Sequence, residues 1–423
     1  MTAGEEAAAP VPLRRNRNFQ LLWIGQVLSG VGFAAARLAY PLLILALTHS
    51  AVIAGAVGTV VAVAQFCLRL PAGALSDRLD RRRTMIVCDS VRAVLLALLG
   101  VLVLAHLISW PFILAIALLE QGAEVIFDPA ANAALPVMVA DAQLEEAWAA
   151  TEGREYAASL IGPALGGALF GLARSIPFLG DAVSYLVSAG TASRLRGRFR
   201  PPEGTERKAL WREAGEGVRL VWREPLLRMV LLQVPLVNFT FSGVMFTIIL
   251  ALRRHGTEPS VIGLVEAGVS AGGLLGALAA ARLQKRLSLS RLVVVVSLAG
   301  VAMFAAAALI VPSPLVAVPI AVSFFLAPTA NAALFAALLR STPEELRGRV
   351  NNTMMMMATG LASLSPLAAG LLVQRVGGEW ALGFFAAVTA VAAVLAIVLP
   401  GLREAERAAA ARPAGDTADP CDG

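Results

Sequence analysis

Long apolar runs separated by short polar connections form the main pattern of this chain. Twelve such runs can be traced, at approximately 19–47, 52–76, 84–105, 109–137, 147–172, 174–195, 226–252, 260–283, 289–311, 314–339, 350–374 and 380–399. A helix of about 20 residues crosses the hydrocarbon core of a bilayer, and an open strand edge would leave backbone groups unpaired there. The pattern therefore predicts an all-α membrane protein with twelve transmembrane helices.

The second half of the chain repeats the first. The segment DPAANAAL at 128–135 returns as APTANAAL at 327–334, and GALSDRLDRRR from Gly73 returns in degraded form as GALAAARLQKR from Gly276. Parallel repeats of six helices are a known construction of carriers that open alternately to the two faces of a membrane. We therefore expect two pseudo-symmetric six-helix bundles, at 19–195 and 226–399.

Three polar segments lie outside these bundles, at 1–18, 196–225 and 400–423. In the central linker, Trp211, Val218 and Trp222 recur at helical spacing with arginines beside them. This predicts either an amphipathic helix on the inner leaflet or a plain tether packed on the helix ends. The last segment is rich in Ala, Asp, Pro and Arg, and we expect it to be disordered.

Composition and charge support a membrane location. Hydrophobic residues make up 58% of the chain, charged residues 15%, and the mean hydropathy is +0.74, which excludes a water-soluble fold. Most Lys and Arg residues fall in the connections of one face, so both termini are expected in the cytoplasm, with the protein in the inner (plasma) membrane. The net charge of +6 then follows from topology and gives no reason to expect nucleic-acid binding.

Motifs for enzymatic chemistry are absent from the sequence. It contains no GxxxxGK[ST], HExxH or GxSxG segment, and none of its three His residues has a second ligand at metal spacing. Its three Cys residues do not suggest a disulfide framework. We therefore expect no enzyme activity, cofactor or metal site.

Two short motifs show a family resemblance. Seven residues match the signature G-x-L-[AS]-D-[RK]-x-G-R-[RK], namely Gly73, Leu75, Ser76, Asp77, Arg78, Arg81 and Arg82, while Asp80 replaces the usual Gly. Gly162, Pro163, Gly166 and Gly167 match the G-P-x-x-G-G core of an exporter signature. The whole chain resembles the major facilitator superfamily, and DRLDRRR, FDPAANAALP and PEELRGRV are similar to its enterobactin-exporter-like and macrolide-efflux-like branch.

The resemblance implies a gate at the loop after the second helix. Gly73 would allow close helix packing, and Asp77 would face a helix N-terminus of the other half when the inner gate is shut. Such an interaction contributes about 0.3–2 kcal/mol, which is small enough to be broken during transport. Arg81 and Arg82 have an equally good explanation as topology-determining charges.

Charges inside the predicted helices form two groups. We assign to an inner-gate layer Arg69, Asp89, Arg92, Arg154 and Glu155, with Asp128 at the same depth. Nearer the membrane centre, Arg37 and Glu120 are at similar depth and able to pair, and Glu120, Glu124 and Asp128 follow one helical stripe. Unpaired charge in hydrocarbon is costly, so these groups should face the interior of the bundle.

Acids outnumber arginines in the N-terminal half, so some are expected to carry a proton. Glu120 or Glu124 is the expected proton site, and a static ion-pair network is the alternative. Relative to the resembled branch, Phe33 stands where an Asp is frequent and Leu118 where proton antiporters place an Arg. Arg37 is expected to supply the missing cation.

These features predict a monomeric secondary transporter that exports a small amphiphilic compound, such as a drug, antibiotic or siderophore, by proton antiport and alternating access. An importer of the same fold is the nearest alternative, and a non-transporting membrane sensor is a further one.

The substitution Asp77→Asn distinguishes a carrier from a sensor. Removing this charge should stall transport, because the predicted latch requires an anion at a helix N-terminus. Accumulation of an amphiphilic dye in cells expressing each form measures the effect. Normal efflux by the variant would contradict the gating role.

Overall fold

The computed structural model describes residues 11–76, 78–197, 199, 224–285, 288–342, 347–399, 401–402 and 404. Asp77, the predicted linker helix around Trp211 and nearly all of the C-terminal tail lie outside these residues, so the predictions for them stay predictions.

The described part of the chain is mostly helical and contains no strand. In the first half they are α1 (Arg17–Thr48), α2 (Ala51–Ser76), α3 (Arg81–Leu104), α4 (Trp110–Met138), the short η1 (Asp141–Gln143), α5 (Leu144–Leu172) and α6 (Ile176–Ser193). In the second half they are α8 (Pro225–Arg254), α9 (Pro259–Gln284), α10 (Leu289–Ile310), the short η2 (Pro314–Val316), α11 (Ala317–Ser341), α12 (Arg347–Ala362), α13 (Ser365–Arg375) and α14 (Gly378–Val398). The predicted all-α class is confirmed.

Each of the twelve predicted apolar runs contains a long helix or, for the eleventh, the pair α12 and α13. Ten spans among the described residues are long and apolar enough to cross a membrane. The other two long helices, α5 and α6, are less apolar and are not among these ten spans. Both pack against α1 in the same bundle.

The eleventh span is interrupted between α12 and α13. The amide of Ser363 donates to the carbonyl of Thr359 at 3.1 Å, and that of Leu364 donates to Leu361 at 3.1 Å. The hydroxyl groups of Ser363 and Ser365 donate to the carbonyls of Gly360 and Ala362, at 2.7 and 2.8 Å. Backbone groups at the interruption therefore keep hydrogen-bond partners, as the hydrocarbon environment requires.

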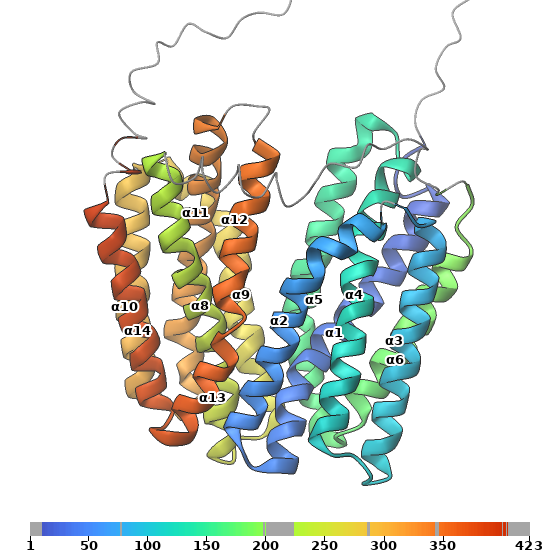
Figure 1. Ribbon diagram of the computed structural model, residues 1–423, viewed down its shortest axis with the longest axis horizontal. Helices are drawn as coiled ribbons and strands as arrows, with labels where there is room; N and C mark the ends of the chain where they lie inside the picture. Colours follow the sequence, from blue (N-terminus) through green and yellow to red (C-terminus); the bar gives the residue numbers. More distant parts are fainter. Residues whose placement is uncertain are drawn as a thin grey trace, which may run out of the picture. The chain divides into compact units, whose positions relative to one another are not determined.

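The chain divides into two compact units. Unit 1 comprises 1–205 with 256–267, and unit 2 comprises 206–255 with 268–423. In unit 1, α1 packs against α5 and α6, while α4 packs against α2 and α3 (Figure 1). The start of α1 packs against the start of α3 and the end of α4 through buried apolar side chains. These include Phe19, Leu22, Met85 and Leu135.

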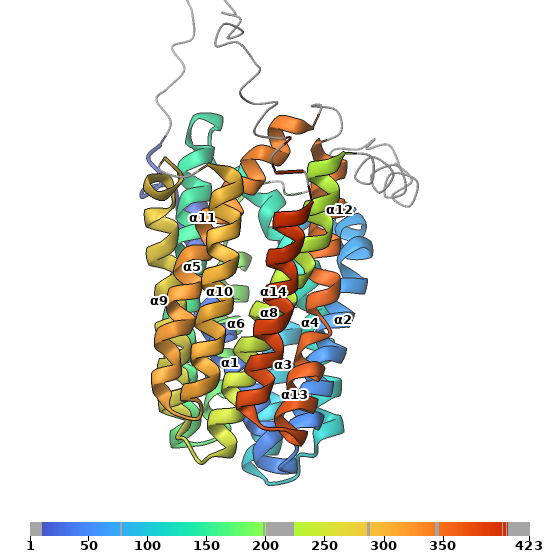
Figure 2. The same cartoon turned by 90° about the vertical axis from the view of Figure 1, so that its left-hand side faces the viewer.

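In unit 2, α14 packs against α8 and α10, and α8 also contacts α12 and α13 (Figure 2). Small residues allow α9 to approach α11 closely. A Cβ built on Gly272 would lie 2.4 Å from the carbonyl oxygen of Ala321, and one on Gly276 would lie 2.0 Å from that of Phe325. A side chain would therefore not fit at either glycine, which is typical of closely packed membrane helices.

The Gly-Pro motif of α5 packs in a similar way inside unit 1. A Cβ on Gly162 would lie 2.3 Å from the Cβ of Ala34, and one on Gly166 would lie 2.4 Å from the carbonyl oxygen of Ala35. Gly167 faces Pro259, in the part of α9 that belongs to the same unit. By contrast, nothing in the described chain lies within 4 Å of a Cβ on Gly73, so the close contact predicted there is not formed in unit 1.

The substitution Gly166→Ala tests this packing, with Gly171→Ala in the same helix as its control. A methyl group at Gly166 meets the backbone of α1, whereas one at Gly171 meets no atom within 4 Å. We expect Gly166→Ala to lose about 1–3 kcal/mol of stability, as overpacking does, and Gly171→Ala to lose none. Thermal unfolding in detergent compares them, and equal midpoints would contradict the tight α1–α5 contact.

Candidate functional site

Arg92 is the buried cation at the centre of the site. It lies on α3 and is 4% exposed. Its Nη2 atom is 3.8 Å from Oε1 of Glu120 and 3.7 Å from Oε2 of Glu124. These two glutamates are one helical turn apart on α4, so a single guanidinium reaches both.

Two aromatic rings from other helices contact the same guanidinium. Its Cζ atom lies 4.0 Å from the ring centroid of Tyr185 on α6 and 5.4 Å from that of Phe33 on α1. A cation over an aromatic face gains about 0.5–2 kcal/mol, most when water is excluded. Arg92 therefore joins α1, α3, α4 and α6, and Phe33 on α1 stands beside it.

Each glutamate has a further polar partner. The hydroxyl of Tyr40 on α1 donates to Oε2 of Glu120 at 2.7 Å, and the ring of Tyr40 packs edge-on against Phe178 at 5.2 Å. The amide of Gln121 donates to Oε2 of Glu124 at 3.2 Å. The Tyr40 bond is short, as expected for a hydroxyl donating to a carboxylate, and it ties Glu120 to α1.

A third carboxyl group, Asp181 on α6, lies close enough to interact electrostatically with Arg92 and Glu120. It is 1% exposed and accepts a hydrogen bond from the hydroxyl of Ser184 at 2.8 Å, while its Oδ2 atom has no hydrogen-bond partner. Glu120 and Glu124 thus pair with the guanidinium, and Asp181 interacts with it electrostatically without forming an ion pair. The Arg92 cluster, as we call it, comprises Phe33, Tyr40, Arg92, Glu120, Glu124, Asp181 and Tyr185.

The structure pairs charged residues that the sequence analysis had placed at different depths in the membrane. Arg37 forms no ion pair within the described chain, so the cation beside Glu120 is Arg92 and the expected Arg37–Glu120 pair is wrong. Arg92 is likewise not paired with Asp128, its predicted neighbour in the inner layer. An arginine side chain extends several ångströms from its Cα, so the depth of the Cα does not determine its partner.

Another member of the predicted layer, Arg154, has its own partners. It donates to Oε1 of Gln26 on α1 and, at 3.3 Å, to Oε1 of Glu155. Asp89 is fully buried one turn before Arg92 on α3, and Arg69 is exposed. The five residues assigned to the layer therefore do not form one continuous set of ion pairs among the described residues.

Two arginines of the loop motif donate hydrogen bonds to backbone carbonyls of other helices within unit 1. Nη1 of Arg81 donates to the carbonyl of Ala133 on α4 at 2.8 Å. Arg82 donates to the carbonyl of Ala192 at 3.3 Å and to that of Ser193, the last residue of α6. The bonds of Arg82 lie at the C-terminus of α6, where a cation satisfies free carbonyls and the helix dipole. These two arginines hold the last turns of α4 and the end of α6 beside the start of α3.

Asp80, the departure from the signature, has a structural explanation. Its carboxylate accepts a hydrogen bond from the amide of Arg83 at 3.0 Å and so caps the N-terminus of α3. The usual glycine would leave this amide without a side-chain acceptor.

A family model described as "Transmembrane secretion effector" matches residues 7–418. The chain belongs to this family. It is also 28% identical over 407 residues to the multidrug efflux pump Tap of Mycolicibacterium fortuitum, covering 92% of this chain and 97% of the relative. The Tap pump of Mycobacterium tuberculosis is 26% identical over 420 residues, covering 93% and 97%.

Solved structures agree on the fold. A nucleoside transporter superimposes with a TM-score of 0.70 at 12% identity, covering 90% of this chain and 98% of that one. A bacterial homologue of the iron transporter ferroportin gives 0.70 at 17% identity, covering 92% and 99%. The protein is thus a multi-pass membrane transporter with the major facilitator fold, and not an enzyme, as the sequence predicted.

Sequence reasoning missed the two tyrosines of the Arg92 cluster. The chain has three tyrosines in 423 residues, and two of them, Tyr40 and Tyr185, lie in this cluster. A hydroxyl group inside an otherwise apolar helix needs a polar partner. Because tyrosine is so rare in this chain, its presence in two predicted membrane helices indicates a polar environment at those positions.

The pair Tyr40→Phe and Tyr185→Phe tests the hydrogen bonding of the cluster. Tyr40→Phe removes the donor to Glu120 and should cost about 1.5–3 kcal/mol, the range for a hydrogen bond to a charged group. Tyr185→Phe should cost little, because this hydroxyl has no hydrogen-bond partner and the ring facing Arg92 remains. Thermal unfolding in detergent ranks them, and the reverse order would refute this description of the cluster.

Proposed function

We propose that the protein is a proton-coupled efflux transporter of small amphiphilic compounds in the plasma membrane. The observation that carries this proposal is the buried Arg92, which forms ion pairs with two carboxyl groups and interacts electrostatically with a third, all within unit 1. If all three were ionised, the cluster would hold two uncompensated negative charges in a medium where one charge costs at least about 2.5–3.5 kcal/mol. Binding of protons relieves that cost.

Glu124 is the proposed site of proton exchange. Its side chain is 13% exposed, against 5% for Glu120, so water reaches it more readily. Glu120 is tied to α1 by the hydroxyl of Tyr40 and to α3 by Arg92, which suits a carboxylate that remains in place. A proton on Glu124 cancels its attraction to Arg92 and frees the guanidinium to interact more strongly with Glu120.

Such a change would bias the equilibrium between two arrangements of the helices that Arg92 joins. A ligand, here a proton, shifts a conformational equilibrium only by its difference in affinity for the two states. Each proton moving inward adds about 2.3 kcal/mol per 100 mV of membrane potential. In the proposed cycle the halves at 19–195 and 226–399 act as two bodies, with the Asp77 loop as gate and both termini in the cytoplasm.

Export is favoured by two independent features. The Gly-Pro residues of α5 match an exporter signature, and two relatives aligned over more than nine-tenths of the chain are named multidrug efflux pumps. We accordingly propose drug-like amphiphiles as cargo and a single chain as the working unit.

Substitution of the two glutamates by glutamine tests the coupling. In inverted vesicles, Glu124→Gln should abolish pH-driven uptake of an amphiphilic dye that the wild type accumulates, because a glutamine cannot release a proton. Glu120→Gln should reduce it through loss of the Arg92 contact. Glu145→Gln is the matched control, since that side chain is exposed in the first turn of α5 and lies outside the cluster.

Nigericin, which collapses the pH difference, should reduce wild-type uptake to the level of Glu124→Gln. Full pH-driven uptake by both the Glu120 and Glu124 variants would exclude these residues from coupling.

A further inference from the structure

One buried carboxyl group of unit 1 lies outside the Arg92 cluster. Asp89 is fully buried on α3, three residues before Arg92. Neither of its carboxyl oxygens has a hydrogen-bond partner among the described residues. The hydroxyl of Ser188 on α6 lies beside Asp89 without forming a hydrogen bond of normal geometry. An ionised carboxylate in such a place is strongly destabilising unless a cation approaches it.

A matching donor lies one helical turn away. The Nε atom of Arg92 is buried and has no hydrogen-bond partner in the described part of the chain, although Nη2 of the same side chain pairs with Glu120 and Glu124. Residues three apart lie on the same side of a helix, and Asp89 and Arg92 interact electrostatically. No ion pair joins them among the described residues. A small movement of the guanidinium would therefore create a bond for two groups that now have none.

Asp89 is nearer than Glu124 to the end of unit 1 that carries the loop motif. It follows Arg81, the first residue of α3, by eight residues, which corresponds to about 12 Å of helix. Glu124 precedes Met138, the last residue of α4, by 14 residues, or about 21 Å. These two helix ends lie together, because Met85 and Met138 belong to one buried apolar cluster. Of the two carboxyl groups, Asp89 is thus the closer to this end by about 9 Å.

Hydroxyl groups continue from Asp89 toward that end along α6. Ser188 is buried, and Thr191, one turn further along, is partly buried and donates to the carbonyl of Ser188 at 2.9 Å. The start of α1 lies against both residues, since a Cβ on Gly25 would meet both hydroxyl oxygens. A hydroxyl group both donates and accepts, so it can pass a proton onward.

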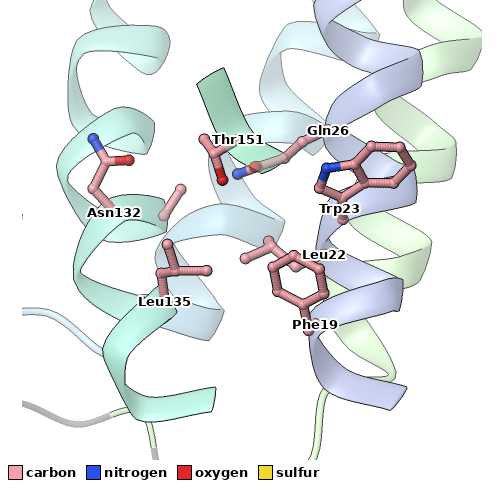
Figure 3. A pocket seen from close by; sticks show the side chains of 8 residues that line it. Phe19, Leu22, Trp23, Gln26, Asn132, Leu135 and Thr151 are labelled. Carbon is pink, nitrogen blue, oxygen red and sulfur yellow. The ribbon is translucent and has the colours of Figure 1, made fainter. Parts of the chain in front are cut away.

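The same end of unit 1 offers a place for water. Figure 3 shows a hollow between α1, α4 and α5 that is about the size of one water molecule. Its polar lining consists of Gln26, Asn132 and Thr151, and Gln26 directly follows Gly25. A proton released along α6 therefore arrives at a part of the bundle where water is able to accept it.

We propose that Asp89 releases the transported proton and that Arg92 displaces it. While Arg92 is paired with Glu124, Asp89 carries a proton. A proton that binds to Glu124 breaks this ion pair, the guanidinium keeps Glu120 and turns Nε toward Asp89, and the proton of Asp89 leaves toward the loop-motif end. One proton is bound for each one released, so the charge of the buried groups stays constant. The inference rests on the proposed proton coupling and adds the residue of release.

Other titratable groups around this pair come from three helices. They are Cys88 on α3, Asp181 and Tyr185 on α6, and Glu120, Glu124 and Asp128 on α4. None of these is a cation, so all the acids among them compete for Arg92. A test must therefore identify the proton of Asp89 separately from the others.

Infrared spectra of the purified full-length protein in lipid at neutral pH test the displacement without substrate. The carbonyl stretch of a protonated carboxyl group is distinct from carboxylate bands, and the band lost in Asp89→Asn identifies the proton of Asp89. Glu124→Gln keeps position 124 neutral and should remove the same band, because Arg92 then turns to Asp89. Ser90→Ala is the control and should keep the band, since this hydroxyl bonds to the carbonyl of Ile86 within α3. Persistence of the band in Glu124→Gln, or no loss in Asp89→Asn, would overturn the proposal.

Transport assays separate proton release from a structural role. In inverted vesicles, Asp89→Asn should lose pH-driven dye uptake but keep dye exchange in the absence of a pH gradient, because exchange requires no proton release. Asp89→Glu restores a carboxyl group and should recover part of the pH-driven uptake. Loss of both activities in Asp89→Asn with no recovery in Asp89→Glu would reduce Asp89 to a structural residue.

Glu124→Gln distinguishes this inference from the proposed function. Full pH-driven uptake by Asp89→Asn together with its loss in Glu124→Gln would reject Asp89 as the site of release and leave the proposed coupling intact. Full uptake by both variants would reject both.

Discussion

Burial of the Arg92 guanidinium is the constraint on which the organisation of unit 1 depends. A charge placed among membrane helices is tolerated only where partners surround it. Here α4 supplies two carboxylates, α1 and α6 supply aromatic faces, and α6 adds Asp181. Four helices are therefore tied to one side chain, so a change in the charge of one partner affects the packing of all four.

Among the described residues, close helix packing recurs in both units, whereas the ion pairs described here do not. Helix packing through small residues recurs in both units, at Gly162 and Gly166 in one and at Gly272 and Gly276 in the other. The ion pairs described above all lie in unit 1. Packing through glycine depends only on backbone shape, which a repeat preserves, whereas a buried charge persists only where its partners persist as well.

The fold was predictable from sequence because the lengths of the apolar runs and the internal repeat bear on it directly. The runs correspond to the helices, and the Gly-Pro residues of α5 lie in a tight helix contact. Pairing of embedded charges was less predictable. Arg92 and Glu120 lie on different helices, and the choice between Arg37 and Arg92 as the cation depends on how α1 and α3 are rotated about their axes. The pattern of hydropathy along the chain does not determine these rotations.

The interruption between α12 and α13 divides the eleventh span into two helical segments. Serine hydroxyl groups and 3.1 Å backbone bonds satisfy the carbonyls that a break in a helix would otherwise leave bare. Serine thereby does for this break what water does for a break in a soluble helix, and the span is divided inside the bilayer without leaving its peptide groups bare.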